Sequence, residues 1–243
     1  MTDLIDRSFA AKPLHRTFTT VPRRYDLVNR VVTWGFDQRW RRVAARNCLA
    51  WQPKRVLDIG CGTGDLIISI AQRAQQDMEL VGIDYSLPML KIAVKKAKRL
   101  VPERKISFVY GDVSNLPFPD GYFDCVGISF AFRNLTYRNP LAQHHLAEVH
   151  RVLAPGGRYV IVETSQPKSK LVRKIFHLYL RGVVSRLGYF LSGNKGAYYY
   201  LAESAANFYT PKEVKQMLFG AGFRAVYYRP LFFGAAGIHE AIK

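Results

Sequence analysis

The chain has 243 residues, of which 49% are hydrophobic and 22% charged, as in ordinary globular proteins. This length suits one large α/β domain. No run of eighteen apolar residues and no apolar N-terminal segment occurs, so we expect neither a transmembrane helix nor a secretory leader. Three cysteines without a C-x-x-C pair are typical of a reduced, cytoplasmic protein and argue against a cysteine-rich metal site.

The formal net charge of +18 is unevenly distributed along the chain. Residues 1–55 contain 12 Lys and Arg against 4 Asp and Glu, and residues 166–230 contain 11 against 2. Residues 56–165 are nearly balanced, with 12 against 11. The basic flanks are therefore the segments able to contact a nucleic acid, an anionic membrane or an acidic substrate. A basic surface that only aids solubility is the plain alternative.

The N-terminal segment is expected to be helical after a loose arm of about 22 residues. From residue 23 to 49 the apolar residues follow a helical pattern, with a break after Trp34. Trp34 and Trp40 serve either as core residues or as a pocket lid, and the sequence favours neither reading. We therefore divide the chain into an N-terminal helical arm or lid, residues 1–50, and a main domain, residues 51–243.

The main domain alternates short apolar runs with helical patterns, which predicts a parallel sheet wound on both faces. A basic amphipathic helix over 171–191 and a further helical turn then interrupt the alternation. A capping box at Thr210 and Glu213 opens another helix before two terminal strands. The prediction is an α/β fold: a seven-stranded, mostly parallel sheet with helices on both faces and a helical insertion at about 168–209. Strands are expected at 56–59, 79–84, 106–112, 123–129, 158–163, 224–229 and 232–242, and helices at 66–74, 88–100 and 141–153.

A glycine loop, Gly60-Cys-Gly-Thr-Gly64, follows the first strand. Dinucleotide folds use G-x-G-x-x-G, whereas here the third glycine comes two positions after the second. With Asp58 upstream, this is the D-x-G-x-G-x-G arrangement typical of S-adenosylmethionine (SAM) methyltransferases. Carboxylates near the loop suit a ligand with an ammonium and a sulfonium better than they suit a pyrophosphate. Taken alone, the loop is equally compatible with a plain tight turn.

Acidic residues stand where the second and third strands are expected to end. Asp84 follows the glycine loop by about twenty residues and is placed to accept hydrogen bonds from two ribose hydroxyls. Asp112 is placed for the amino group of an adenine. Acids that only cap the following turns are the alternative. Together with the loop, the two acids predict a SAM site more specifically than any one of the three.

Several motifs resemble the menaquinone/ubiquinone biosynthesis C-methyltransferase family, within the Rossmann-like class I SAM-dependent methyltransferases. The resemblance covers roughly residues 24 to 243. Its most specific parts are the F-x-x-R-N element after the fourth strand and the Y-L-A-E-S element in the insertion. The motifs that carry it lie at 56–65, 111–120, 123–129 and 151–157 for the class, and at 25–29, 129–135 and 198–204 for the family.

The resemblance implies methyl transfer from SAM to a ring carbon of a prenylated hydroquinone, with no metal. It implies Arg133 and Asn134 as catalytic residues, because a cation beside a phenol oxygen stabilises the phenolate that makes the ring carbon nucleophilic. A helix-capping arginine is the alternative for Arg133, and the proton acceptor stays open. The implied SAM-binding residues are Asp58, Gly60, Gly62, Thr63, Asp84, Tyr85, Asp112, Val113 and Ser129. The implied substrate-binding residues are Tyr25, Asn29, Phe132 and Tyr200.

The histidines are expected to be structural. His144 and His145 belong to a helix that should pack away from the site, and His239 belongs to a terminal strand. The insertion departs from the family pattern at 192–195 and at Tyr199, so the acceptor stays open among ubiquinone and menaquinone precursors, a plastoquinone-like ring and another lipophilic phenol.

Other functions fit the residues less well. A nucleic-acid methyltransferase is disfavoured because Ser129-Phe-Ala-Phe132 replaces the Asn/Asp-Pro-Pro-aromatic tetrad of base-modifying enzymes, and we expect no nucleic-acid partner. The glycine spacing disfavours an oxidoreductase, and retained Asp84 and Arg133 disfavour a non-catalytic SAM-fold protein. The preferred hypothesis is a cytoplasmic enzyme that contacts the anionic inner face of the membrane peripherally. A homodimer is left open.

Overall fold

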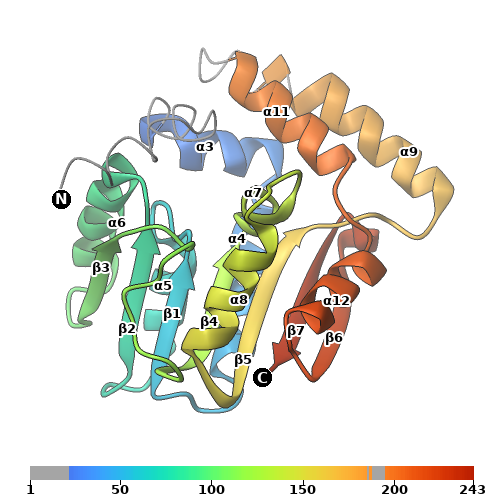
Figure 1. Cartoon of the computed structure of the whole chain (residues 1–243). Helices are drawn as coiled ribbons and strands as arrows, with labels where there is room; N and C mark the ends of the chain where they lie inside the picture. The colour runs from blue at the N-terminus through green and yellow to red at the C-terminus, as the bar shows by residue number, and fades with distance from the viewer. Residues whose placement is uncertain (1–21, 185, 188–194) are drawn as a thin grey trace, which may run out of the picture.

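A seven-stranded sheet forms the centre of the protein (Figure 1). The computed structural model describes residues 22–184, 186–187 and 195–243. The strand order is β3-β2-β1-β4-β5-β7-β6, and only β7 runs antiparallel to its neighbours, so the predicted mostly parallel sheet is confirmed. The strands are β1 (Arg55–Ile59), β2 (Glu79–Asp84), β3 (Ile106–Tyr110), β4 (Phe123–Ser129), β5 (Leu153–Thr164), β6 (Ala225–Leu231) and β7 (Ala236–Ile242).

Helices cover both faces of the sheet, as predicted. One face packs against α4 (Phe36–Leu49), α5 (Asp65–Ala71) and α6 (Leu87–Leu100). The other packs against α7 (Phe132–Thr136), α8 (Ala142–Val152) and α12 (Pro211–Gly220). Because Ala44, Ala45 and Cys48 are buried against the sheet, α4 is part of a covering layer.

A further helical layer lies over the carboxyl ends of the parallel strands (Figure 1). It consists of α3 (Pro22–Val32), α9 (Lys170–Tyr179), a π-helical turn (Leu180–Val184) and α11 (Lys195–Ala206). The layer has its own small core, because apolar residues of these four elements pack together away from the sheet. The buried members of this core are Val28, Val32, Leu180, Val184, Ala202, Ala205 and Ala206.

The structure differs from the sequence prediction at several element boundaries. The predicted strand 232–242 is wrong at its start, where Phe232–Gly234 forms a 3₁₀ turn with Phe232 and Phe233 at φ of 44° and 55°. β5 begins at Leu153 and runs through the predicted Pro155-Gly-Gly turn, while β3 already ends at Tyr110. Of the helix predicted over 171–191, residues 171–184 and 186–187 are helical, and 185 and 188–191 lie outside the described residues.

Helix α12 begins with a side-chain cap. At α12, Thr210 Oγ1 accepts a hydrogen bond from the Glu213 N–H, and the Glu213 carboxylate accepts one from the Thr210 N–H at 2.7 Å. The predicted capping box is therefore present.

Among the helices of the described residues, none is both long and apolar enough to cross a lipid bilayer.

Candidate active site

A cavity opens at the carboxyl ends of β1, β2 and β4, where a parallel sheet places its ligand sites. We call it the glycine-loop cavity. All nine residues predicted to bind the cofactor line it: Asp58, Gly60, Gly62, Thr63, Asp84, Tyr85, Asp112, Val113 and Ser129. The structure therefore brings together residues that are up to 71 positions apart, because each lies near or just beyond the carboxyl end of a strand at the same edge of the sheet. The lining also includes residues for which no cofactor contact was predicted, among them Arg41, Asp65, Met89, Asn139 and His145.

The glycine loop presents backbone to this cavity. Gly60 and Gly62 have φ of +59° and +54°, a region that side-chain-bearing residues rarely adopt. A Cβ at Gly60 would lie 2.9 Å from Ala131 Cβ, so a larger residue cannot be accommodated without movement. At Gly62 no atom of the described residues lies within 4 Å of the position of a Cβ. The loop therefore combines tight packing behind Gly60 with open space in front of Gly62.

Asp84, the last residue of β2, stabilises the glycine loop by a hydrogen bond. Its Oδ2 accepts a hydrogen bond from the Gly62 N–H at 2.8 Å, and its Oδ1 accepts one from the Ser86 N–H at 2.8 Å. Burial raises the pKa of Asp84 to about 6, although these two hydrogen bonds act in the opposite direction. The carboxylate is therefore mostly ionised at neutral pH and lies in the cavity wall as a hydrogen-bond acceptor.

Asp58, in β1, is almost completely buried, with an exposed fraction of 1%. Its Oδ2 accepts a hydrogen bond from the Ile67 N–H at 3.1 Å, while its Oδ1 has no partner among the described residues. Burial raises the pKa of Asp58 to about 8, so its carboxyl group is mostly protonated at neutral pH in the absence of a ligand. A cationic group in the cavity would favour the ionised form. Asp58 is therefore suited to an ammonium group.

The opposite end of the cavity is formed by the segment after β3 and by α8. Asp112 Oδ1 accepts a hydrogen bond from the Ser114 N–H at 2.9 Å. His145 Nδ1 lies 2.9 Å from the Leu135 carbonyl oxygen, and its Nε2 lies 4.0 Å from Asp112 Oδ1. His145 is buried and lines the cavity, so the prediction that its helix packs away from the site is wrong for this residue. The exposed His144 contacts Ser114 instead.

A cluster of charged groups ties α3 to the glycine loop. Asp26, in α3, accepts a hydrogen bond from Thr63 Oγ1 at 2.6 Å and one from Lys96 Nζ at 2.6 Å. Lys96 Nζ also donates to Asp65 Oδ1 at 2.6 Å. Burial acts to raise the pKa of Asp65, but Arg41 and Lys96 outweigh it and the pKa is lowered. The predicted SAM contact Thr63 is thus also a contact of the N-terminal helical layer.

A second cavity, of about 500 Å³, lies under the helical layer and next to the first. We call it the apolar cavity, because most of its lining is aliphatic and aromatic. Trp34 and Trp40 both line it, which favours the pocket-lid reading of these residues. Arg41, Phe130 and Asn134 line both cavities and form their shared wall. The other apolar lining residues include Val32, Phe36, Val172, Ile175, Phe176, Leu180, Val184, Leu201, Phe232 and Phe233.

Arg133 lies at the wall of the apolar cavity with an exposed fraction of 4%. Its Nη1 donates to Glu163 Oε1 at 3.0 Å and to Thr164 Oγ1 at 2.8 Å, and its N–H donates to Glu163 Oε2 at 3.0 Å. Its Nε has no partner among the described residues, and neither has Asn134 Oδ1. Buried polar groups rarely stay unpaired, so both atoms are suited to a polar ligand group in the cavity.

The four predicted substrate-binding residues fall in different places. Asn29 lines the apolar cavity. Phe132 is fully buried, packs against Tyr159 and Phe208, and lines neither cavity, so its observed contacts are in the core and its substrate contact stays a prediction. Tyr25 belongs to α3 and Tyr200 to α11, but their side chains lie outside the described part of the protein.

Two charged residues of α4 complete the region between the cavities. Asp37 Oδ2 accepts a hydrogen bond from Arg41 Nη1 at 2.5 Å, and Asp37 Oδ1 accepts one from Thr33 Oγ1 at 3.0 Å. Arg41 Nε donates to Ser129 Oγ at 3.0 Å. Sequence reasoning missed both residues. Their i,i+4 spacing, which places them on one face of a helix, is the signal that could have indicated a pair.

The sheet order, the glycine loop and the strand-end acids define a class I SAM-dependent methyltransferase. Solved structures support this fold. A SAM-dependent methyltransferase from Aquifex aeolicus superposes with a TM-score of 0.56 at 18% identity, covering 78% of this chain and 81% of that one. An O-methyltransferase family protein from Burkholderia thailandensis superposes with a TM-score of 0.64 at 13% identity, covering 90% of this chain and 59% of that one.

Sequence comparison identifies the family within this class. The model of the ubiE/COQ5 methyltransferase family matches residues 6–243, and the chain belongs to this family. A demethylmenaquinone methyltransferase from Deinococcus radiodurans is 43% identical over 96% of this chain and 93% of its own length. One of the same name from Thermus thermophilus is 44% identical over 91% of this chain and 97% of its own length.

The glycine-loop cavity fits SAM by its own chemistry. Asp58 lines it and has an Oδ1 without a partner among the described residues, the Asp84 carboxylate lines it as an acceptor, and the backbone at Gly62 can be approached closely. No cluster of three or more His, Cys, Asp or Glu residues that could hold a metal ion occurs in the part of the chain that is described.

Proposed function

We propose that this methyltransferase methylates a ring carbon of a prenylated hydroquinone, the demethylmenaquinol class being favoured over ubiquinol precursors. The observation that carries the proposal is the apolar cavity of about 500 Å³, which shares a wall with the glycine-loop cavity and has the unpaired polar atoms of Arg133 and Asn134 in that region. An aromatic ring with a long apolar tail suits such a lining. The two relatives named demethylmenaquinone methyltransferase support the choice of ring.

The proposed assignment of the glycine-loop cavity follows its chemistry. When bound there, SAM supplies the methyl group as a sulfonium, which needs little further activation. Asp84 accepts hydrogen bonds from the ribose hydroxyls, and Asp112 with Val113 holds the adenine. Asp58 pairs with the ammonium, and its pKa falls as it does so. Gly60, Gly62, Thr63, Tyr85 and Ser129 provide the remaining contacts.

Arg133 and Asn134 are proposed to act on the hydroquinone. The Arg133 guanidinium, held by Glu163 and Thr164, stabilises the negative charge of a phenolate, and this charge makes the neighbouring ring carbon nucleophilic. Asn134 Oδ1 orients the ring by accepting a hydrogen bond from a hydroxyl. Asn29, with Tyr25 and Tyr200 from the sequence motifs, forms the remaining polar contacts. The rate gain comes chiefly from positioning the ring carbon against the methyl group.

The function is tested with purified protein, SAM carrying a labelled methyl group, and demethylmenaquinol in detergent. Label is expected in the ring methyl of menaquinol, measured by mass spectrometry. The oxidised demethylmenaquinone should be inert, because it has no phenol to ionise. A ubiquinol precursor that lacks its ring methyl tests the choice of ring. Absence of label from both reduced acceptors would refute the proposal, and label in the ubiquinol precursor alone would reverse the assignment.

We also propose that the helical layer contacts the inner face of the membrane. On α9, Leu171, Ile175 and Leu178 have exposed fractions of 68%, 58% and 72%. Their spacing places them on one side of the helix. Trp34 and Phe233, at 79% and 82%, are exposed and line the apolar cavity.

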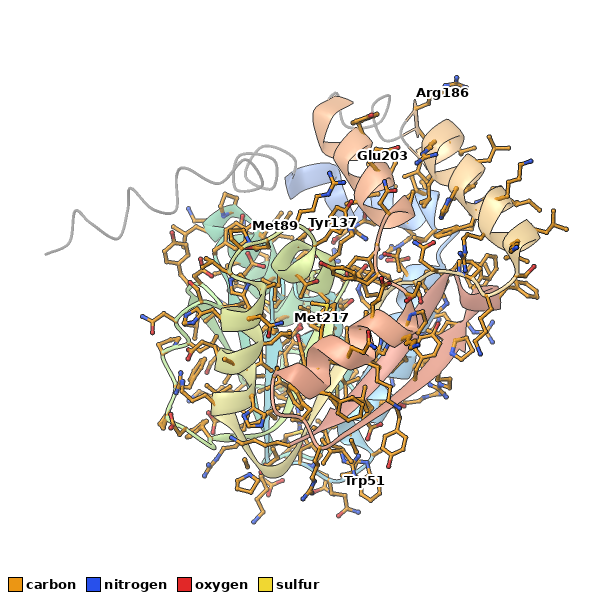
Figure 2. All side chains as sticks on the ribbon, turned by 45° about the vertical axis from the view of Figure 1, so that its right-hand side comes forward. Trp51, Met89, Tyr137, Arg186, Glu203 and Met217 are labelled. Atoms are coloured by element: carbon orange, nitrogen blue, oxygen red, sulfur yellow. The ribbon has the colours of Figure 1, made fainter. Side chains whose placement is uncertain are left out.

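Exposed basic residues of the same region are Lys168, Lys170, Lys174 and Arg186, the last labelled in Figure 2 at the outer side of this layer. Apolar and basic side chains together suit an anionic lipid surface.

Vesicle sedimentation tests this contact. Burial of one leucine side chain contributes about 1.5–3 kcal/mol, so Leu178→Glu is expected to weaken binding to phosphatidylglycerol vesicles about tenfold or more. Leu100→Glu, at the exposed end of α6, is the matched control and should bind like the wild type. Equal binding of both variants, or wild-type binding that ignores the anionic lipid, would contradict the proposal.

A further inference from the structure

We propose that Asp37 is the proton acceptor of the reaction and takes the ring proton that the methylated carbon loses. The inference rests on the proposed function, because it assumes that the apolar cavity holds a hydroquinone. It adds a residue that neither the sequence motifs nor the family resemblance indicated.

The chemistry requires a base for one proton per methyl group. The new carbon–carbon bond forms at the ring as the sulfur–methyl bond of SAM breaks, and its electron pair stays on the sulfur of the departing S-adenosylhomocysteine. The ring carbon then carries both a methyl group and a hydrogen, and the ring is no longer aromatic. The C–H bond then breaks, its electron pair restores the aromatic ring, and the proton passes to the base. A phenol has a pKa of about 10 and a carboxylic acid one of about 4, so a carboxylate is a poor base for a phenolic proton. It is a sufficient base for a proton whose loss restores aromaticity.

Asp37 is in the right place for this step. It lies in the first turn of α4 with an exposed fraction of 2% and lines the apolar cavity. Its Oδ2 is bonded to Arg41, which belongs to the wall shared by the two cavities. The carboxylate is therefore next to the region where the two ligands meet, and Arg41 fixes its orientation.

The other ionisable residues of this lining are less suitable. Among the described residues that line the apolar cavity, these are Arg41, Arg133 and Tyr179. Arginine carries its proton at all relevant pH values and cannot accept another. The Tyr179 hydroxyl donates a hydrogen bond to the Val32 carbonyl oxygen at 2.6 Å, and burial raises the pKa of Tyr179. The Asp37 carboxylate remains as the group of this lining whose oxygens can accept a proton.

Glu163 is a competing carboxylate because it holds Arg133, but its contacts direct it elsewhere. Its Oε2 accepts from the Arg133 N–H, and its Oε1 accepts from Arg133 Nη1 and from the N–H of Thr164. Glu163 does not line the apolar cavity. Its role is to hold Arg133. By contrast, Asp37 Oδ1 accepts a hydrogen bond from Thr33 Oγ1, and Thr33 itself lines the apolar cavity. A carboxylate oxygen accepts more than one hydrogen bond, so this contact leaves capacity for the proton.

The test uses the whole protein with demethylmenaquinol, unlabelled or deuterated at the ring carbon that receives the methyl group. Asp37→Asn keeps the size of the side chain and its bond from Arg41 but removes the base. General-base catalysis contributes about 10²–10⁴-fold, so kcat is expected to fall about 100-fold or more. Breaking the C–H bond should then limit the rate, and an isotope effect on kcat that is absent in the wild type should appear. The affinity for S-adenosylhomocysteine, measured by calorimetry, should not change.

Two further variants make the result decisive. Asp120→Asn also removes a carboxylate bonded to an arginine, but at a surface site on Arg151, and should behave like the wild type. Asp37→Glu keeps the carboxylate at a different reach and should show a smaller loss with a measurable isotope effect. It serves as the test if Asp37→Asn does not fold. Wild-type kcat in the Asp37 variants, or a lower kcat without an isotope effect, would overturn the inference. If the wild type itself methylates no quinol, the proposed function fails instead.

Discussion

Replacing Arg133 with methionine is expected to lower kcat of the ring methylation by about 10²–10³-fold, the usual loss when one preorganised charge-stabilising donor is removed from a site. The reason is geometric: Nη1 is held by Glu163 and Thr164, while the buried Nε has no partner among the described residues and is a donor available to a phenolate. Methionine fills a similar volume without charge. Steady-state kinetics with labelled SAM measure kcat, and calorimetry should find the affinity for S-adenosylhomocysteine unchanged.

The control for this variant must separate chemistry from stability. Removing one partner of a buried ion pair costs about 3–5 kcal/mol, because the other charge is left unpaired. The double variant Arg133→Met/Glu163→Gln removes both charges, so it should recover thermal stability but not kcat. Arg138→Met, on an exposed arginine that stacks over Tyr137, should leave both unchanged. Recovery of kcat in the double variant would show that Arg133 acts through the fold alone.

Replacing Phe132 with alanine is expected to lower the free energy of unfolding by about 3–5 kcal/mol, as for other fully buried phenylalanines. The ring is completely buried and packs edge-on against Tyr159 and Phe208, so its removal leaves a cavity between α7 and the sheet. Because Phe132 lines neither cavity of the site, KM for the quinol should not change in the fraction that remains folded. Urea unfolding followed by circular dichroism measures the loss of stability.

Phe219→Ala is the matched control for this prediction. Phe219 lies in α12 with an exposed fraction of 44%, and its replacement should change the unfolding free energy by less than about 0.5 kcal/mol. A stable Phe132→Ala protein with a raised KM would support the substrate contact that the sequence predicted.

Much of the glycine-loop cavity could be predicted from the sequence because its residues are tied to strand ends. An apolar run predicts a buried strand, and a residue directly after it must lie at the carboxyl edge of a parallel sheet. Asp58, Asp84, Asp112 and Ser129 are therefore placed by local pattern alone. Local pattern also predicted the insertion and the mostly parallel order of the sheet. The spacing of apolar residues differs between helices and strands, so the sequence shows where the two alternate and where helices follow one another.

The other part of the site depends on contacts that no local pattern contains. Phe132 and Arg133 are neighbours in the chain, but the five-residue helix α7 directs one into the core and the other to the apolar cavity. His145 reaches Asp112 only because α8 packs beside the loop after β3. Asp37 and Arg41 reach the site because α4 packs against the sheet rather than extending as an arm. Each is a matter of tertiary packing, and one sequence does not fix it.

Helix α3 touches both ligand sites, and this has a thermodynamic consequence. Asp26 at its N-terminal half bonds to Thr63 of the glycine loop, while Asn29 and Val32 further along line the apolar cavity. Because the Thr63–Asp26 hydrogen bond connects the two regions, a ligand that shifted Thr63 and moved α3 with it would also change the wall of the apolar cavity. Linkage then requires reciprocity: whatever factor the first ligand imposes on the affinity of the second, the second imposes on the first. With α3 in contact with both regions, the binding constants of the two ligands are then thermodynamically coupled.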